Sequence, residues 1–512
     1  MRIKSVLKSV SASIISYMIL FLAGILVRKL FLRNFEVELL GYEGLFSSVF
    51  MVLSAMDLGA GSMFSYMLYQ ALAQNDTKEI SIIMSMYQKL YRCIGMLVFL
   101  AGTVIYFFLP YIIQENTQNG LYVRAIYLIQ LAGTLVSYFL AYKRALLIAD
   151  QQNFEVVTIE TFYKAVNLLI RAVIIITVSD YILYALVPLA ANLAVNIHLS
   201  SMAEKRFPGV FHTKVSMDDF KSRNIVRQLK DTSFTRIALM FYNSADSILV
   251  SMLAGITNMG LLTNYNTINE VLKLALSYIT VPLGSAAGNF IYTETKEKTR
   301  DFYFILDFIC FIFAGVSAAF YVCCFQKAVG YVFGKQYVMS IFVPAALGAD
   351  FYVRCRGIVY SVFQGALGHY DIQKKYSVVS AFVNIILSVL LGIYFGVAGI
   401  LSATAIGNII IHAGRAKVTA GWIEGITLKS FLVREIQYMT VSAAMVMVSL
   451  FLTGSAPWTL GGVLGSAVTA AAVCGLMIVL FFRSTARYRM TVNYVKDLKA
   501  VFIHSNKGSK QK

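Results

Sequence analysis

Apolar segments of about twenty residues recur along the whole chain, and they restrict the fold more than any other feature of the sequence. One of them, IGMLVFLAGTVIYFFLPYII, begins at Ile94 and contains no charged residue. A segment of this length can cross the hydrocarbon core of a bilayer as a helix. Hydrophobic residues make up 58% of the 512 residues and charged residues only 14%, and the mean hydropathy is +0.70. Soluble domains carry roughly a quarter charged residues, so the sequence predicts a polytopic membrane protein.

The number of crossings follows from the same length requirement. A span needs about 20 apolar residues, and on that basis we count about 14 candidates. They are centred near residues 20, 55, 98, 133, 168, 190, 242, 275, 310, 350, 384, 405, 442 and 470. Because a chain in lipid must satisfy its own backbone hydrogen bonds, every span is expected to be helical. The first span has no obvious small-residue cleavage site, so we interpret it as a retained helix rather than a signal peptide.

The distribution of basic residues predicts the orientation of the chain. The net charge of +18 would suggest a nucleic-acid partner in a soluble protein. Assigning Lys and Arg to alternate loops, however, places about 29 on the side of the N-terminus and about five on the other side. This asymmetry is typical of cytoplasmic loops, so we expect both termini in the cytoplasm, an even number of spans and no nucleic-acid partner.

Two echoes in the sequence predict an internal duplication. The stretch LLGYEGLFSSV is echoed by NMGLLTNYNTI, and the segment around Asn167 is echoed by the segment around Asn384. Matching Gly41 to Gly260 and Asn167 to Asn384 gives offsets of about 219 and 217 positions. Two repeats that each hold an even number of spans share one membrane orientation, and the substrate site is then expected between them.

The duplication defines the expected domain organisation of an all-α protein. We predict two six-helix lobes, followed by two further helices and a basic tail. The N-terminal lobe covers residues 1–205, a cytoplasmic linker 206–221, the C-terminal lobe 222–425, the two further helices 426–483, and the cytoplasmic tail 484–512.

Charged residues within the predicted spans indicate a functional site. An isolated charge at mid-membrane costs at least about 3 kcal/mol, so such residues are expected to face a wet cavity rather than lipid. Cations in a cavity suit a large anion, and the planar donor fork of arginine suits phosphate. The candidate substrate-binding residues are Arg124, Lys164, Arg171, Arg236, Lys273 and Arg354.

Helical spacing separates these cations into two groups. Glu160 lies four residues before Lys164, and Glu270 lies three residues before Lys273, so each pair shares a helix face and could neutralise itself. The arginines at positions 124, 171 and 236 have no evident local partner of opposite charge. We therefore expect these arginines to line a watery chamber between the two lobes.

Three acids within the spans, Asp57, Asp246 and Glu270, have two interpretations. A carboxylate in low dielectric could bind a coupling proton or sodium ion, or it could cap a polar cluster between helices. Gly59 and Gly61 follow Asp57 and permit close helix packing or a local bend, of which we favour close packing. The six cysteines show no metal-ligand spacing, so neither a metal nor another cofactor is expected.

Five segments follow one another along the chain in a distinctive order: GYEGLFSSVFMVLSAMDLGAG, ADQQNF, SADSILVSMLAGITNMGLLTNYNTI, GNFIYTE and FVNIILSVLLGIYFGVAGILSATAIGN. In order and spacing they resemble Wzx-type polysaccharide flippases of the MOP superfamily, over nearly the whole chain. The resemblance implies two six-helix lobes around a cavity, often with two further helices. It also places Asp57 and Asp246 at the family's acidic positions, and Arg236 where relatives often have a basic residue.

The resemblance implies a transport function in a bacterial cytoplasmic membrane. The expected cargo is a polyprenyl-pyrophosphate-linked oligosaccharide, turned from the inner to the outer leaflet by alternating access for capsule or cell-surface polysaccharide export. A polysaccharide polymerase or other export proteins are possible partners. A MATE-like cation-coupled multidrug exporter is the first alternative, although it favours an acidic cavity. A membrane glycan polymerase or ligase is the second, although it favours a large extracytoplasmic loop, which this chain lacks. We therefore expect a transporter rather than an enzyme.

Overall fold

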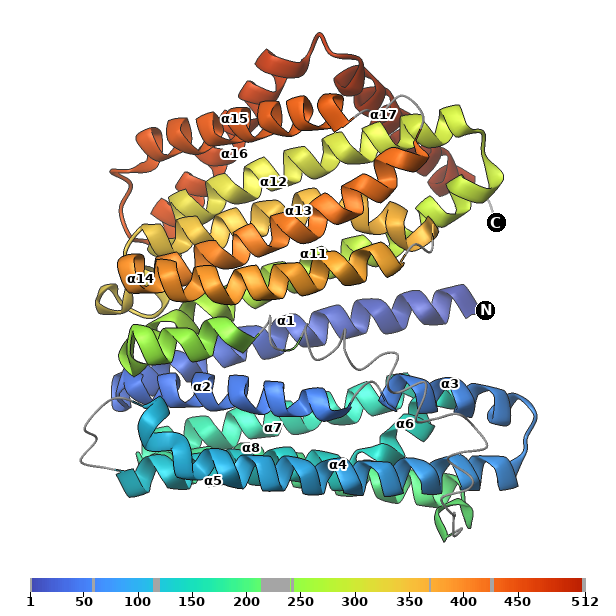
Figure 1. The fold of residues 1–512 in the computed structure, drawn as a ribbon, viewed down its shortest axis with the longest axis vertical. Helices are drawn as coiled ribbons and strands as arrows, with labels where there is room; N and C mark the ends of the chain where they lie inside the picture. The colour runs from blue at the N-terminus through green and yellow to red at the C-terminus, as the bar shows by residue number, and fades with distance from the viewer. Residues whose placement is uncertain are drawn as a thin grey trace. The chain divides into compact units, whose positions relative to one another are not determined.

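The computed structural model describes the backbone of residues 2–57, 60–113, 120–212, 240, 244–367, 370–423 and 428–508, with side chains from residue 18 to residue 497 except at a few positions. All regular elements in these ranges are helices (Figure 1). The chain divides into two compact units, Met1–Gly260 and Leu261–Lys512. The predicted all-α membrane fold is confirmed, whereas the predicted lobe and linker boundaries stay predictions.

Within the described residues, unit 1 consists of helices. In chain order its elements are α1 (Arg2–Asn34), α2 (Val37–Ser54), the 3-10 turn η1 (Ala55–Asp57), α3 (Ala60–Ala73), α4 (Thr77–Ile112), α5 (Gly120–Leu140), α6 (Tyr142–Ala149), α7 (Asn153–Thr177), α8 (Tyr181–Arg206), η2 (Val210–His212), the helix Ser244–Leu253 and the start of α11 (Ile256–Thr293).

Unit 2 holds the rest of α11 and the longest helices. Its further elements are α12 (Lys296–Val332), η3 (Lys335–Tyr337), α13 (Phe342–Leu367), α14 (Tyr370–Trp422), α15 (Leu428–Thr453), α16 (Leu460–Phe482) and α17 (Ala486–Gly508). Helix α12 packs against α13, α15, α16 and α17 and so forms the centre of this unit.

Eight helices of the described residues are long and apolar enough to cross a membrane. They are α2, α4, α5, α8, α12, most of α14, α15 and α16. The spans predicted near residues 168 and 350 lie on α7 and α13, which carry more charged residues, and those predicted near residues 20 and 275 lie on α1 and α11. The centre of the span predicted near residue 242 lies outside the described residues.

Helix α14 contains two of the predicted spans, those near residues 384 and 405. Its backbone leaves the helical region at Gly396 (φ 58°, ψ −139°), a conformation that glycine adopts without steric cost. Ser380 Oγ donates to the carbonyl of Gly407 at 2.7 Å, and Asn384 Nδ2 donates to Thr404 Oγ1 at 3.0 Å. These pairings show that the chain reverses at Gly396, as two separate spans require.

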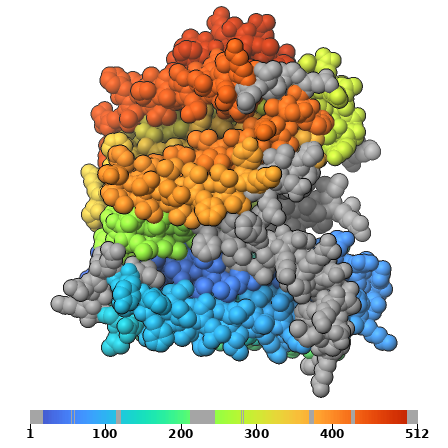
Figure 2. Space-filling model, in the orientation of Figure 1, coloured from blue at the N-terminus to red at the C-terminus, as the bar shows by residue number. Residues whose placement is uncertain are grey.

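The outer face of unit 1 is apolar. On α4, large side chains such as Phe99, Leu100 and Phe107 are exposed, and α4 forms part of the face of unit 1 turned to the viewer in Figure 2. A large exposed apolar surface is stable where lipid rather than water surrounds it.

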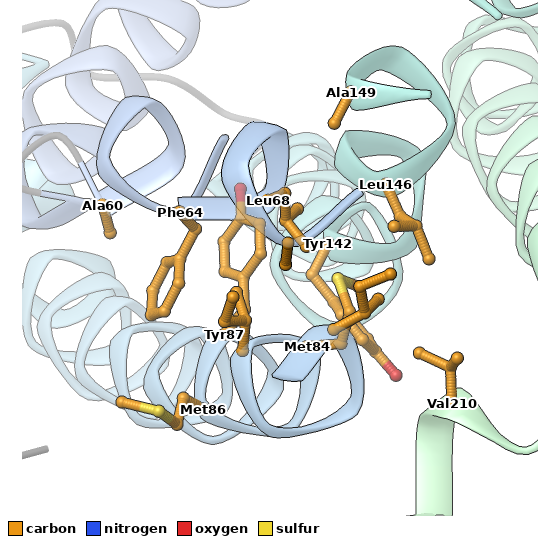
Figure 3. Close-up of a cluster of buried hydrophobic side chains, with 13 residues drawn as sticks. Ala60, Phe64, Leu68, Met84, Met86, Tyr87, Tyr142, Leu146, Ala149 and Val210 are labelled. Carbon is orange, nitrogen blue, oxygen red and sulfur yellow. The ribbon is translucent and has the colours of Figure 1, made fainter. Parts of the chain in front are cut away.

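A buried cluster holds one end of this unit together. Phe64 of α3 stacks on Tyr87 of α4 with ring centroids 4.5 Å apart, and Tyr142 and Leu146 of α6 complete the cluster with Val210 of η2 (Figure 3). Full burial of such aromatic and aliphatic side chains fixes the positions of α3, α4 and α6. The cluster therefore holds Tyr87 in place beside the functional site described below.

Helices α2 and α11 meet through a reciprocal glycine contact inside unit 1. A Cβ added at Gly41 would clash with the carbonyl of Ile256, and one added at Gly260 would clash with the carbonyl of Val37. Gly260 lies 219 positions after Gly41, and Ile256 lies 219 positions after Val37. Both separations equal the offset of the sequence echo. At these two positions the backbones lie so close together that any side chain would clash, which glycine avoids.

Unit 2 contains a largely buried ionic network that joins α12, α13 and α15, in which Glu435 keeps 17% of its side chain exposed. Arg356 donates through Nη2 to Asp307 Oδ1 at 2.7 Å and to Glu435 Oε1 at 2.6 Å. Arg434 lies 3.3 Å from Asp307 Oδ2, and Tyr360 donates to Glu435 Oε1 at 2.7 Å. Two cations and two acids balance each other here, so the charges stabilise one another without solvent.

Candidate functional site

Two adjoining cavities lie inside unit 1, between α5, α7 and α8. The first, here called the Lys164 cavity, has a volume of about 590 Å³, and the second, the Arg171 cavity, about 570 Å³. Both volumes fall within the range of small-molecule sites, roughly 300–1,000 Å³. Ser137, Pro188 and Asn192 line both cavities, so the two spaces meet at these residues.

A polar stripe on α7 runs along both cavities. Glu160, Lys164, Asn167 and Arg171 follow one another at spacings of four, three and four residues, which places them on one face of the helix. The first three line the Lys164 cavity and the fourth lines the Arg171 cavity. At 1.5 Å per residue the stripe extends over about 16 Å. The rest of α7 is mainly apolar, so this face is the one suited to a polar ligand.

The Lys164 cavity carries more positive than negative lining charge. Glu160 forms an ion pair with Arg144 of α6 rather than with Lys164. The pairing of Glu160 with Lys164 that the helical spacing allowed does not form. The carboxylate of Glu160 pairs with the guanidinium of Arg144 instead. Lys164 makes no ion pair within the described parts of the chain, which leaves its ammonium group as the spare charge of this cavity.

The Arg171 cavity contains an acid that the sequence did not predict there. Arg171 Nη2 lies 3.2 Å from Glu43 Oε1, and its guanidinium carbon lies 3.7 Å from the ring centre of Tyr184. Arg171 has no acidic partner nearby in the sequence, and its partner Glu43 comes from α2, 128 positions away. Arg28 of α1 interacts electrostatically with Glu43, Tyr184 and Arg171. Two arginines thus share one carboxylate.

Neutral polar groups fill the junction of the cavities. Asn192 Nδ2 donates to the carbonyl of Gly133 at 2.8 Å and to Ser137 Oγ at 3.0 Å, and Asn196 Nδ2 donates to Asn192 Oδ1 at 2.7 Å. Pro188 lies one turn before Asn192 and has no N–H to donate, so the helical bond of α8 is interrupted beside the junction. Amide and hydroxyl groups of this kind can exchange hydrogen bonds with sugar hydroxyls.

Asp57 lies at a break between two helices and next to the Lys164 cavity. It ends the 3-10 turn η1 between α2 and α3. A Cβ added at Gly61, which lines the cavity, would lie 3.3 Å from the hydroxyls of Tyr87 and Tyr91 and 4.0 Å from Asp57 Oδ2. Both interpretations of the glycine segment therefore apply: the chain bends at η1, and Gly61 provides close packing. Gly59 lies outside the described residues.

The remaining predicted residues occupy other places. Arg124 lies in the second turn of α5, with its guanidinium 5.6 Å from the ring centre of Tyr106. Lys273 pairs with Glu270 at 3.0 Å, as the spacing predicted, and Glu270 is mostly exposed. These three residues belong to neither cavity.

Arg354 of α13 pairs with Asp350 at 2.8 Å, and Asn408 Nδ2 donates to the other carboxylate oxygen at 2.6 Å. Asp246 lies in the helix Ser244–Leu253 and is partly buried. Arg236 lies outside the described residues. The assignment of these residues to a substrate or ion site stays a prediction.

Sequence reasoning missed Arg28, Glu43 and Asn192. The spacing within α7 offered one signal, since Asn167 completes a polar stripe with Lys164 and Arg171. Among the described residues, no group of three or more His, Cys, Asp and Glu side chains could hold a metal ion.

The sequence matches no protein-family model and no curated protein sequence. The fold, however, is similar to solved MOP superfamily transporters. The match to the structure of the lipid II flippase MurJ, in an inward closed conformation, spans 92% of this chain and 99% of the MurJ chain, with a TM-score of 0.68 and 14% identity. An inward-facing MATE family multidrug resistance transporter covers 80% of this chain and 96% of its own, with a TM-score of 0.62 and 15% identity.

The Vibrio cholerae MATE transporter VcmN gives a TM-score of 0.51 at 15% identity, covering 81% of this chain and 97% of its own. These neighbours are transporters or flippases rather than enzymes. The chain has the fold of a MOP superfamily transporter and crosses the membrane several times.

Proposed function

We propose that this chain is a flippase that moves polyprenyl-pyrophosphate-linked oligosaccharide repeat units from the inner to the outer leaflet of a bacterial cytoplasmic membrane. The observation that carries the proposal is the polar stripe of α7, with Lys164 and Arg171 lining two joined cavities inside a MOP transporter fold. Its physiological role is export of capsule or another surface polysaccharide, and both termini of the chain lie in the cytoplasm.

The cost of crossing lipid explains why such a stripe is needed. Moving a hydroxyl or amide into an apolar medium without a hydrogen-bond partner costs about 4–8 kcal/mol relative to water, and an isolated ion costs far more. An oligosaccharide pyrophosphate therefore needs a continuous polar path. In our proposal, Lys164 and Arg171 attract the pyrophosphate, Asn192 and Ser137 meet the sugars, and the prenyl tail remains in the lipid.

Alternating access completes the mechanism. Rocking of the two predicted lobes exposes the loaded site first to the inner and then to the outer side, as in other transporters built from repeats. A contribution of Arg124, Arg236, Lys273 and Arg354 to a site between the lobes remains part of the proposal. Asp57, Asp246 or Glu270 would bind the coupling proton or sodium ion.

The similarity to the MurJ structure supports a lipid-linked substrate. That protein is named for lipid II, and its structure matches 92% of this chain, whereas the MATE transporters match 80% or 81%. A multidrug exporter remains the second candidate, because Asp57 lies beside a cavity that three tyrosines, Tyr87, Tyr91 and Tyr163, line. The positive excess of the lining charges favours an anionic cargo instead.

A leaflet assay tests the proposal. Purified protein is placed in vesicles with a polyprenyl-pyrophosphate oligosaccharide that bears a fluorescent sugar, and a membrane-impermeant quencher reports the share in the outer leaflet. Arg171→Gln and Lys164→Gln should each slow transfer roughly 10-fold or more, because hydrogen bonds to charged groups contribute about 1.5–3 kcal/mol. Lys143→Gln is the matched control, since Lys143 pairs with Glu204 and lines neither cavity.

Two results would contradict the proposal. One is a leaflet distribution that purified protein leaves unchanged, and the other is transfer by both cavity variants at the rate of the control. Vesicles loaded with a fluorescent organic cation separate the second candidate: uptake driven by a proton or sodium gradient, without lipid transfer, would identify an exporter.

A further inference from the structure

We propose that Glu43 is a built-in competitor of the transported anion for Arg171, and that it limits how tightly the Arg171 cavity holds that anion. The inference rests on the proposed function, because it takes the pyrophosphate of the cargo as the competing anion. Glu43 already occupies the position that a phosphate oxygen must take to reach the same guanidinium nitrogen.

The carboxylate of Glu43 is held in place from two sides. Its Oε1 accepts hydrogen bonds from Arg171 Nη2 and from the hydroxyl of Tyr181, both at 3.2 Å. Tyr181 is almost fully buried and packs edge-on against Phe31 of α1 and against Phe35, which follows the end of α1, with ring centres 5.9 and 5.8 Å away. A buried aromatic side chain of this kind has little freedom to move, so the carboxylate has a defined position in the cavity wall.

Arg171 is oriented but its donors are not all used. A guanidinium has five N–H donors. The Nε of Arg171 is buried and has no hydrogen-bond partner within the described part of the chain, while stacking on Tyr184 fixes the plane of the group. The ion pair with Glu43 therefore does not use all the donors of Arg171, so the guanidinium has hydrogen-bonding capacity left for a second acceptor.

The local charge is unbalanced in the direction that an anion needs. Arg28 and Arg171 together carry two positive charges, and Glu43 supplies one negative charge. Removing the charge of Glu43 doubles the positive excess and also removes a like charge that faces the incoming pyrophosphate. Both changes strengthen anion binding.

A weakened site serves transport because a carrier must release what it binds. Sites along a transport path need to bind strongly enough for entry and weakly enough for exit. Once the pyrophosphate leaves, the carboxylate of Glu43 pairs with Arg171 again, so the cavity does not contain an unpaired cation. We therefore expect a Glu43 variant to bind its cargo more tightly and to turn over more slowly.

Calorimetric binding of inorganic pyrophosphate to the purified full-length protein tests the inference. Glu43→Gln should lower the dissociation constant about 10-fold or more, because the amide keeps the size of the side chain and removes its charge. Glu204→Gln is the matched control, since Glu204 is also ion-paired in unit 1 but lines neither cavity. In a protein that already carries Arg171→Gln, adding Glu43→Gln should lower the dissociation constant for pyrophosphate by less than about a third of this factor, because the two side chains act on each other.

The outcomes separate this inference from the proposed function. Weaker binding in Arg171→Gln together with unchanged or weaker binding in Glu43→Gln would overturn the competitor role and keep the anion site. Unchanged binding in Arg171→Gln would remove the anion site itself. If Glu43→Gln folds poorly, Glu43→Ala and the pyrophosphate-induced rise in melting temperature give the same comparison: a larger rise than in the native protein supports the inference, and an equal or smaller rise overturns it.

Discussion

Replacing Arg356 by methionine should destabilise unit 2 strongly without touching either cavity of unit 1. The side chain of Arg356 is 5% exposed and that of Asp307 is 0% exposed, so solvent cannot replace the lost partner. The variant removes the hydrogen bonds at 2.7 and 2.6 Å that hold Asp307 and Glu435. Methionine is close to the arginine stem in shape, so the loss is mainly electrostatic.

The magnitude follows from what remains around Asp307. Removing one member of a buried ion pair usually costs about 3–5 kcal/mol. Arg434 stays 3.3 Å from Asp307 Oδ2 and compensates part of its charge, and partners within the membrane lower such energies further. We therefore expect about 3 kcal/mol, the lower end of the range. For a unit of this size that corresponds to a fall in melting temperature of about 6 °C.

The assay is fluorescence-monitored thermal unfolding of the purified protein in detergent. Lys298→Met is the matched control on α12, because the Lys298–Glu294 pair is exposed and should contribute less than about 1 kcal/mol. Replacing all four network residues, Arg356, Arg434, Asp307 and Glu435, by methionines and leucines should recover much of the loss, because apolar groups of similar volume can replace a buried network when no charge is left without a partner. A melting temperature of Arg356→Met within 1 °C of the control, on the order of experimental error, would refute the reasoning.

Three further predictions concern unit 1. Gly41→Ala should lower the melting temperature, because its Cβ clashes with the Ile256 carbonyl and relief of such overpacking costs about 1–3 kcal/mol. Gly24→Ala is the control and should not lower it, because nothing lies within 4 Å of the added carbon. Equal melting temperatures of the two variants would disprove the close contact. Asn192→Leu should fold yet slow lipid transfer several-fold, because it removes the donor that bonds Gly133 and Ser137 and narrows the junction; native transfer rates would show that cargo does not pass there. Gly61→Leu should reduce transfer as well, since the larger side chain displaces Tyr87 and Tyr91 from the cavity wall, and a native rate in a folded variant would exclude this wall from the path.

The candidate site was predictable only in part. Lys164 and Arg171 stand out in the sequence because charges are rare in apolar segments, and both line cavities. Their partners were not predictable, because helical spacing reveals neighbours three or four positions away and nothing more distant. Glu160 had a plausible partner at four positions, yet Arg144 of another helix lies closer. Glu43 of α2 pairs with Arg171 of α7 across 128 positions, a contact that depends on the tertiary structure and not on helical spacing.

The sequence by itself determined the helical membrane fold, because long apolar segments leave a chain in lipid no other way to satisfy its backbone. It also indicated the echo between the segments of Gly41 and Gly260, because the two segments resemble each other at an offset of about 219 positions. Tertiary structure alone decided which charges face one another and where the cavities open. Charge pairing depends on the rotation of each helix about its axis, and that rotation is set by the packing of all its neighbours together.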